Sequence, residues 1–233
     1  CGNIESQYKF GMLLLESANP VEGSKYIKLA ADSGYLRAQK EYAYLARNGS
    51  IIPQNMKIYD HYLKLAADSG DLSSQMEYAA MLEQTAKYPN SNDLQRGMSS
   101  AQIIKNAARY YFLAAQQGDQ NAQFIYGSFL EEGKGVQKDS FEAIKYFKLS
   151  ADQGHTFAQV KLGSLLKNSD EALHYLKLAA DSSNEFAMVA YAKSILFKNS
   201  SDELIKEAFN YLQEGIRLNN SDSMFIIGCI MYY

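Results

Sequence analysis

Cysteine, proline and tryptophan are scarce in this sequence of 233 residues. It contains two cysteines, three prolines and no tryptophan. Cys1 and Cys229 stand near opposite ends of the chain, and a disulfide requires Cα atoms within about 7 Å of each other. We therefore expect no bridge between them. So few cysteines favour a reducing compartment, the cytoplasm.

Long apolar runs and an excess of charge are also missing. No stretch of about 18 consecutive apolar residues occurs, and the chain opens on a polar segment rather than a signal peptide. The formal net charge is -3 and the pI is near 5.7, which gives no electrostatic reason to bind nucleic acid or an anionic membrane. We expect a folded protein that neither binds nucleic acid nor inserts this segment into a membrane.

Three Asn-x-Ser sequons keep a second compartment open. They begin at Asn48, Asn199 and Asn219, and in a lumenal protein they could carry glycans. Because the chain is rich in Asn and Ser, chance is the simpler explanation for them. The endoplasmic-reticulum lumen therefore stays an alternative to the cytoplasm.

The two ends of the chain read like repeats that continue. The sequence has no initiator Met, and the apolar run at 224–233 stops without a capping residue. We interpret the sequence as a section of a longer protein.

One short pattern, Tyr-x-x-x-small-Ala-x-x-Gly, recurs along the whole chain. Successive copies lie 36, 48, 36, 29 and 36 residues apart, beginning at Tyr26, Tyr62, Tyr110, Tyr146, Tyr175 and Tyr211. Self-similarity at such a period is typical of helical repeat proteins. A second block follows at a fixed distance, as in Ala38 to Ala43 and Ala122 to Gly127. Its small residues let a neighbouring helix approach closely, so each repeat is predicted to be two packed helices.

The connector between the two helices of a repeat explains both irregular spacings. In its full form, 133–139, glycines stop the first helix and Asp139 caps the second, with Glu142 completing a capping box. All three prolines, Pro20, Pro53 and Pro89, fall in such connectors. An insertion at about 85–100 gives the long spacing, and a shortened connector near 167–170 gives the short one. We expect repeats at 6–37, 38–73, 74–121, 122–157, 158–186 and 187–222, with a partial repeat at 223–233.

These residues resemble the Sel-one-like repeat, a relative of the tetratricopeptide repeat. The fullest match is 122–154, where ten residues occupy family positions: Ala122, Gly127, Gly133, Gly135, Val136, Asp139, Ala143, Tyr146, Ala151 and Gly154. The resemblance covers essentially the whole chain and implies an all-α fold, a right-handed α-solenoid of about six helix pairs. It also implies a scaffold or adaptor that binds other proteins. The alternative that it leaves open is the regulatory region of a larger signalling enzyme, a protein kinase whose catalytic domain lies outside this chain.

Patterns that carry chemistry are absent or incomplete. The histidines lack metal-ligand spacing, so we interpret all three as ordinary residues: His61, His155 and His174. Cys229 lies among isoleucines and is interpreted as an inert core thiol. Ser164 and Lys167 form a Ser-x-x-Lys sequence without the Lys-Thr-Gly partner of penicillin-recognising hydrolases. We therefore expect a non-enzymatic protein with no metal, no cofactor and no small-molecule substrate.

The first helices of stacked pairs are expected to line the inner surface of the array. Counted from the small residue that opens each first helix, offsets of two, six and nine form a stripe beside the core positions. The stripe comprises Lys40, Tyr44 and Arg47, then Met76, Ala80 and Glu83, then Phe124, Ser128 and Glu131, then Val160, Ser164 and Lys167. All of these except Ala80 and Ser164 are candidate residues of a groove, centred on Phe124, for a helix or an extended peptide. The alternative is that Met76, Phe124 and Val160 simply pack between adjacent first helices.

Overall fold

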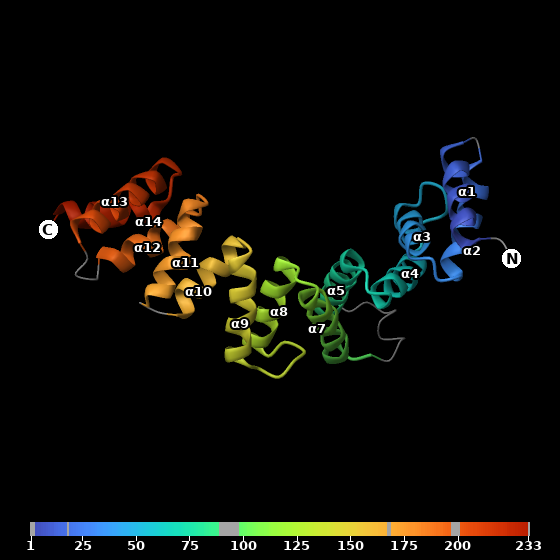
Figure 1. Cartoon of the computed structure of the whole chain (residues 1–233), viewed down its shortest axis with the longest axis horizontal. Coiled ribbons are helices and arrows are strands. Elements are labelled where there is room, and N and C mark those ends of the chain that lie inside the picture. Colours follow the sequence, from blue (N-terminus) through green and yellow to red (C-terminus); the bar gives the residue numbers. More distant parts are fainter. Residues whose placement is uncertain (1–2, 18, 89–97, 167–168, 197–200, 233) are drawn as a thin grey trace. The chain divides into compact units, whose positions relative to one another are not determined.

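The computed structural model describes residues 3–17, 19–88, 98–166, 169–196 and 201–232. Within these residues the chain forms thirteen α-helices and no β-strand (Figure 1). The all-α prediction is therefore confirmed. The number of repeats and their boundaries stay predictions.

The chain divides into two compact units. Unit 1 comprises the described residues of 1–122 and 133–137, and unit 2 those of 123–132 and 138–233. Unit 1 contains α1 (Ile4–Glu16), α2 (Pro20–Asp32), α3 (Leu36–Asn48), α4 (Met56–Asp68), α5 (Leu72–Lys87) and α7 (Ser100–Gln116). Unit 2 contains most of α8 (Gln120–Glu132), then α9 (Ser140–Asp152), α10 (Thr156–Leu165), α11 (Asp170–Asp181), α12 (Glu185–Leu196), α13 (Asp202–Arg217) and α14 (Ser221–Tyr232).

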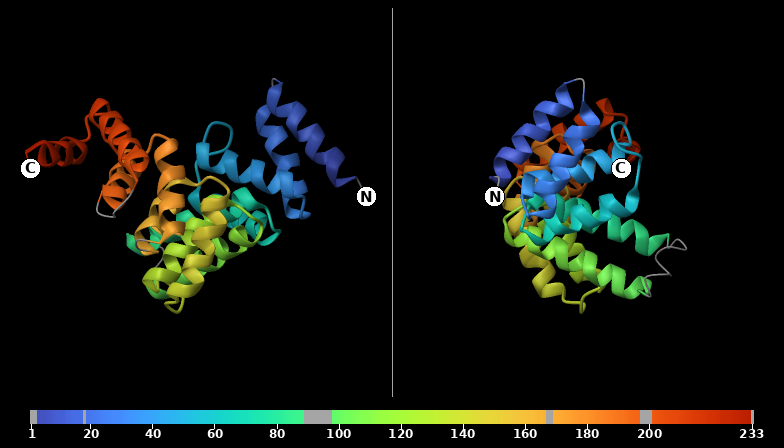
Figure 2. Two further views of the ribbon diagram at one scale, coloured as in Figure 1. Left: turned by 60° about the vertical axis from the view of Figure 1, so that its left-hand side comes forward. Right: turned by 90° about the vertical axis from the view of Figure 1, so that its right-hand side faces the viewer.

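Consecutive helices pack in pairs inside each unit. In unit 1, α1 packs on α2, α3 on α4 and α5 on α7; in unit 2, α10 packs on α11 and α12 on α13 (Figure 2). Each pair also contacts the following one, since α2 touches α3, α4 touches α5, and α11 touches α12. This is the arrangement that the recurring sequence pattern predicts.

Two tyrosine rings meet inside most of the pairs. Tyr42 of α3 and Tyr62 of α4 pack edge to face with centroids 5.0 Å apart. The same contact recurs between Tyr78 and Tyr110 (5.0 Å), Tyr126 and Tyr146 (4.9 Å), and Tyr191 and Tyr211 (5.4 Å). Edge-to-face packing suits the charge distribution of aromatic rings. The interpretation of these tyrosines as packing residues is confirmed.

Tyrosine hydroxyls link four of the pairs to the pair before each. Tyr110 donates to the carboxylate of Asp68 at 2.6 Å, and Tyr175 donates to that of Asp152 at 2.8 Å. Two further bonds of this kind join Tyr62 to Asp32 and Tyr211 to Asp181. Each aspartate ends the Ala-Ala-Asp or Ser-Ala-Asp sequence of the preceding second helix. The repeated motif therefore encodes the stacking of one pair on the next.

Small residues allow the close approach inside a pair. A Cβ atom added to Gly127 would lie 2.8 Å from the Phe147 ring, and one added to Gly163 would lie 2.3 Å from Leu176. Ala43 and Ala79 occupy the corresponding positions of unit 1 and are fully buried. The predicted role of the small residues is confirmed in both units.

Three details of the sequence interpretation need correction. Pro20 is the first residue of α2 rather than a connector residue, because a first helical turn does not need the missing donor. Asp139 caps α9 as predicted, but the backbone N–H of Asp139 donates to Leu130 and Glu142 pairs with Lys145, so the capping box is not formed. Cys229 is exposed and not a core thiol. Its apolar neighbours on α14, such as Phe225 and Ile230, are exposed as well. Pro89 lies outside the described residues.

Candidate protein-binding groove

The structure brings only part of the predicted stripe together. Lys40, Tyr44 and Arg47 lie along α3 and line one groove of unit 1. Met76 and Glu83 lie on α5 of the same unit. Phe124, Ser128, Glu131 and Val160 belong to unit 2, and Lys167 lies outside the described residues.

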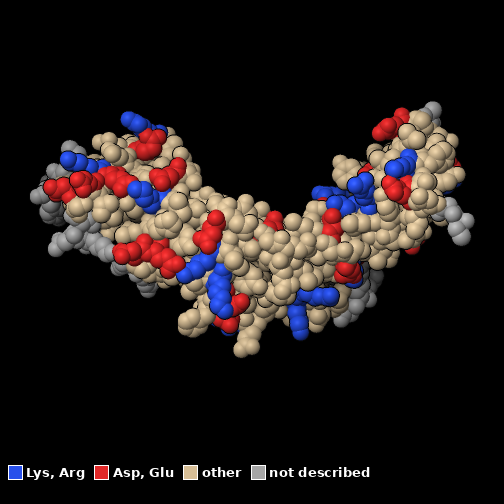
Figure 3. Space-filling view, viewed as in Figure 1, with Lys and Arg blue, Asp and Glu red and all other residues tan. Residues whose placement is uncertain are grey.

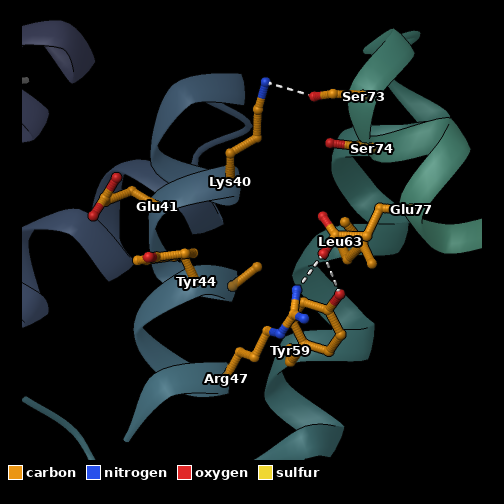
Figure 4. Close-up of a pocket in the computed structure, with 10 residues that line it drawn as sticks. Lys40, Glu41, Tyr44, Arg47, Tyr59, Leu63, Ser73, Ser74 and Glu77 are labelled. Carbon is orange, nitrogen blue, oxygen red and sulfur yellow. Dashed lines mark hydrogen bonds and ion pairs between the residues drawn. The ribbon is translucent and has the colours of Figure 1, made fainter. Parts of the chain in front are cut away.

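The groove of unit 1 has a volume of about 320 Å³. Its walls come from α3 and α5, and residues of α4 close its floor (Figure 4). We call it the α3 groove and define it by its lining residues: Lys40, Glu41, Ala43, Tyr44, Arg47, Tyr59, Leu63, Ser73, Ser74 and Glu77.

Two polar bridges span the groove from α3 to α5. The Lys40 Nζ atom lies 3.0 Å from a carboxylate oxygen of Asp71 and 3.0 Å from the Ser73 hydroxyl. At the other end, an Arg47 guanidinium nitrogen lies 2.5 Å from a Glu77 carboxylate oxygen. Both cations therefore belong to α3, while Asp71 caps α5 and Glu77 lies on α5.

Asp71 holds the start of α5 in place. Its carboxylate accepts hydrogen bonds from the Ser74 backbone N–H (2.9 Å) and from the hydroxyls of Ser74 and Ser73 (both 2.7 Å). Burial alone would raise the pKa of this carboxyl, but these hydrogen bonds and the one from Lys40 outweigh burial and lower the pKa to about 2. Asp71 is therefore ionised at neutral pH and anchors the Lys40 bridge.

Tyr59 forms the floor of the groove at the Arg47 end. Its hydroxyl donates to Glu77 at 2.8 Å, and the Arg47 guanidinium lies over its ring at 5.6 Å. Burial, together with the hydrogen bond to Glu77, raises the pKa of Tyr59 to about 12. Tyr59 and Leu63 are 5% and 3% exposed, so the floor is packed and rigid.

Tyr44 and Glu41 project from α3 on the side away from α5 (Figure 4). The Tyr44 side chain is 59% exposed, while Glu41 is partly buried. Burial raises the pKa of the Glu41 carboxyl. The lining of the groove thus contains two paired cations, Lys40 and Arg47, together with the exposed Tyr44 ring and the Glu41 carboxylate.

The remaining predicted residues of α5 serve other contacts. Glu83 accepts a hydrogen bond from Tyr111 at 3.1 Å and pairs with Lys134 at 2.5 Å. It borders a second hollow, of about 550 Å³, between the end of α5 and the start of α7. Met76 is partly buried on α5.

In unit 2 the stripe residues are engaged in packing. Phe124 is partly buried, with its ring centroid 4.8 Å from that of His155, 5.7 Å from Phe147 and 6.4 Å from Phe157. His155 itself caps α10, because its Nδ1 atom accepts the Ala158 N–H at 3.2 Å. These contacts favour the alternative in which Phe124 packs between helices rather than lining a groove.

The other three stripe residues of unit 2 also have partners. Val160 packs against a cluster that includes Met188. Glu131 pairs with Lys161 at 2.7 Å, and the Ser128 hydroxyl donates to the backbone carbonyl of Phe124. The described stripe residues of unit 2 are thus each in contact with other residues of the chain, and the groove centred on Phe124 stays a prediction.

Several lining residues escaped the sequence analysis. Glu41 and Glu77 stand at offset three of their first helices, and Tyr59 stands on a second helix, whereas the predicted stripe consists of offsets two, six and nine of first helices. A signal existed, since a glutamate recurs at offset three in two successive repeats. It is replaced by Ile125 and Lys161 in the next two.

The described residues show no other kind of site. They contain no group of three or more His, Cys, Asp and Glu side chains that could hold a metal ion, and none of their helices is long and apolar enough to cross a membrane. The Ser164 hydroxyl donates to the Val160 carbonyl. On the face drawn in Figure 3, acidic and basic side chains lie next to one another over both units, in keeping with the small net charge.

Paired helices with a recurrent Tyr-x-x-x-small-Ala motif define a helical repeat protein. The sequence matches the Sel1 repeat model over residues 100–119, 120–155 and 158–184. This part of the chain therefore contains Sel1 repeats, as the resemblance predicted.

Solved structures of repeat proteins share the fold. The chain is similar to a protective antigen of uropathogenic Escherichia coli strains that displays an SLR fold (TM-score 0.69, 22% identity), covering 97% of this chain and 48% of that one. It is also similar to a Sel1 repeat protein from Oxalobacter formigenes (TM-score 0.59, 20% identity), covering 98% of this chain and 66% of that one. The chain thus spans about half to two thirds of the length of these proteins. No curated protein sequence matches it.

Proposed function

We propose that this chain is a protein-binding module that holds a segment of a partner protein in the α3 groove. The carrying observation is the exposed Tyr44 ring on a groove whose floor and cross-bridges are already formed. In this proposal the module has no chemistry of its own and contributes affinity and positioning.

Preorganisation supports the proposal. Lys40 and Arg47 are held by Asp71 and Glu77, and the floor residue Tyr59 is fixed by a hydrogen bond. A partner that enters such a groove orders few side chains, and this reduces the entropic cost of binding. A solvent-exposed aromatic ring beside it supplies the kind of anchor that dominates many interfaces.

The repeat family supports the same class of function. Sel1 repeat proteins are generally protein-interaction modules. A groove between successive first helices suits an extended peptide or a helix, with a few side-chain anchors. The alternative of a kinase regulatory region concerns sequence outside this chain and stays a prediction.

Selection of peptides tests the proposal. The 233-residue chain is panned against a phage library of random dodecapeptides, and the selected peptides are synthesised and titrated by fluorescence anisotropy. We expect Tyr44→Ser to weaken their binding by about tenfold or more, the usual size of an aromatic hot spot. The matched control is Tyr88→Ser, because Tyr88 is 66% exposed in the same unit and outside the groove.

The same titrations can also contradict the proposed binding site. If the selected peptides bind wild type and Tyr44→Ser equally, or are weakened as much by Tyr88→Ser, the α3 groove is not the binding site. Circular dichroism of each variant separates lost binding from lost folding.

A further inference from the structure

The charged groups around the α3 groove do not cancel within the molecule. Lys40 is held by Asp71 and Ser73, and Arg47 by Glu77. Glu77 also accepts the Tyr59 hydroxyl. Among the described residues, Glu41 makes no ion pair and no hydrogen bond through its carboxylate. One negative charge, on the side of α3 that faces away from α5, is therefore left unmatched at the edge of the groove.

Glu41 is also partly withdrawn from water. It lies on α3, three residues before Tyr44, and both side chains project to the same side of the helix (Figure 4). Its charge acts on Tyr8 of α1, whose pKa is raised by burial and by the negative Glu41 carboxylate. Burial is also what raises the pKa of Glu41 itself, with no compensating hydrogen bond or neighbouring cation.

The nearest cation along the helix does not neutralise this carboxylate. Arg37 precedes Glu41 by one helical turn, a spacing at which opposite charges can pair. Arg37 is exposed, and the two residues form no ion pair in the structure. A partly buried carboxylate without a partner destabilises a fold, so its position beside an open aromatic ring points to a ligand that supplies the missing cation.

We propose that Glu41 binds an arginine side chain of the partner segment, with the exposed ring of Tyr44 stacked against the guanidinium. This inference rests on the proposed function of the α3 groove. Arginine fits this site better than lysine, because a planar guanidinium can donate two parallel hydrogen bonds to a carboxylate and stack on an aromatic face at the same time. The charge of the occupant follows from the unmatched charge of the groove.

The experiment compares peptide selections on two proteins. The random dodecapeptide library is panned on wild type and on Glu41→Gln, and the arginine content of the selected pools is counted. We expect arginine to be enriched on wild type and the enrichment to vanish on Glu41→Gln. Equal arginine content in the two pools overturns the inference.

A double-mutant cycle then measures the coupling. The wild-type-selected peptide is synthesised with its arginine, with lysine and with the neutral analogue citrulline in that place. We expect citrulline to weaken binding to wild type by about tenfold to a hundredfold, as for a lost hydrogen bond to a charged group, and to change binding to Glu41→Gln by less than about threefold. A citrulline effect that is the same on both proteins overturns the inference.

Two control variants complete the design. Glu22→Gln removes a glutamate of α2 that pairs with Lys25, and it should leave peptide binding unchanged. Arg37→Gln removes the nearest cation along α3 and should leave binding unchanged or stronger; weaker binding would mean that Arg37 itself contacts the peptide, and this would contradict a site that selects a cation. We expect Glu41→Gln to melt at the same temperature as wild type or higher, since the unpaired charge is gone.

The results distinguish this inference from the function on which it rests. If Tyr44→Ser abolishes peptide binding but Glu41→Gln does not alter arginine selection, the α3 groove binds a partner without an arginine contact. If Tyr44→Ser has no effect, the proposed function fails and the arginine site fails with it.

Discussion

The same repeat position has opposite fates in the two units. Two residues after the small residue that opens a first helix, unit 1 has Lys40, which lines a groove and pairs with Asp71 across it, and Met76, which is partly buried. Unit 2 has Phe124, which packs on Phe147 and His155, and Val160, which packs beside Met188. The repeat fixes where a side chain at this position points. The size and polarity of that side chain decide whether the space beside it is filled by packing or stays open to solvent.

The largest expected effect comes from truncating this position in unit 2. Phe124→Ala removes a partly buried ring and should lower the free energy of unfolding by about 2–3 kcal/mol, somewhat less than a fully buried phenylalanine. Lys40→Ala removes one exposed bridge in unit 1 and should cost about 0.5 kcal/mol. Urea unfolding followed by circular dichroism measures both. Similar losses for the two variants would break the contrast between a packed and an open position.

A buried glutamine recurs in the first helices of the repeats, and we call this series the glutamine ladder. In each unit, one of these glutamines accepts a side-chain hydrogen bond through its side-chain oxygen and another has no hydrogen-bond partner for that oxygen among the described residues. Gln153 donates to the Gln123 side-chain oxygen at 2.7 Å in unit 2, and Gln117 does the same for Gln75 in unit 1. Where serine replaces the donor, at Ser182, the side-chain oxygen of buried Gln159 has no hydrogen-bond partner among the described residues.

We therefore predict opposite effects from exchanging these residues. Gln153→Ser removes the side-chain donor to the buried Gln123 oxygen, and should cost about 1 kcal/mol in the free energy of unfolding. Ser182→Gln supplies the missing donor and should raise it by about 0.5–1 kcal/mol. Denaturant titrations test both changes. The ladder is not a stabilising feature if Ser182→Gln is neutral and Gln153→Ser is harmless.

The helix cap at one repeat position is an ionisable carboxyl in unit 1 and an amide in unit 2. Asp71 caps α5 in unit 1, and Asn184 caps α12 in unit 2 by accepting the Ala187 N–H at 2.9 Å. Replacing either by Ala should cost about 1 kcal/mol at pH 7. The pKa of Asp71 is lowered to about 2 in the fold, so its contribution is complete above about pH 4 and is lost as the pH falls towards 2.

The pH dependence of the two caps follows directly. The difference in unfolding free energy between wild type and Asp71→Ala should shrink between pH 4 and pH 2, while that for Asn184→Ala should stay constant because an amide does not titrate. Urea unfolding at several pH values provides the measurement. A constant Asp71→Ala effect down to pH 2 would contradict the assigned hydrogen bonds.

Much of the fold could be predicted from the sequence. Regular spacing of the tyrosine anchors located the helix pairs, and small residues such as Gly127 and Gly163 located the close contacts within them. The hydrogen bonds between tyrosine hydroxyls and aspartates could not be predicted, because they depend on how one pair rotates against the next. The exposure of Cys229 was missed for a similar reason: apolar neighbours along a helix do not show what covers that helix.

The candidate site was predicted only in part. Counting offsets correctly aligned Lys40, Tyr44 and Arg47 along one helix. It could not show that Lys40 and Arg47 are neutralised by α5 while Glu41 is not, since ion pairs between helices depend on side-chain distances. Nor could it show that Phe124 is engaged in packing, because an aromatic residue at a groove position and one at a core position have the same spacing.

Small effects are also expected from the tyrosine hydroxyls that link successive pairs. Tyr62 in unit 1 and Tyr175 in unit 2 each donate to an aspartate of the preceding pair, and burial together with that hydrogen bond raises the pKa of each to about 12. Because the folded pKa is raised, the contribution to stability is complete below about pH 10 and is lost as the pH rises towards 12.

Removing either hydroxyl should have a similar, modest effect in the two units. Tyr62→Phe and Tyr175→Phe should each lower the free energy of unfolding by about 0.5–1 kcal/mol at pH 7, and the loss of stability between pH 10 and pH 12 should be less steep than in wild type. Thermal unfolding across this pH range tests the prediction. If both variants lose stability between pH 10 and pH 12 as steeply as wild type, ionisation of these hydroxyls does not contribute to the pH dependence of unfolding.

Photo-crosslinking of a library-selected peptide tests most directly whether the α3 groove holds the partner. A diazirine side chain is placed at successive positions of the peptide, and the crosslinked residues of the chain are identified by mass spectrometry. The account predicts crosslinks concentrated on the lining residues of α3, α4 and α5, and their loss in Tyr44→Ser. Crosslinks concentrated in unit 2, around Phe124 and Phe157, or retained in full by Tyr44→Ser, would contradict it.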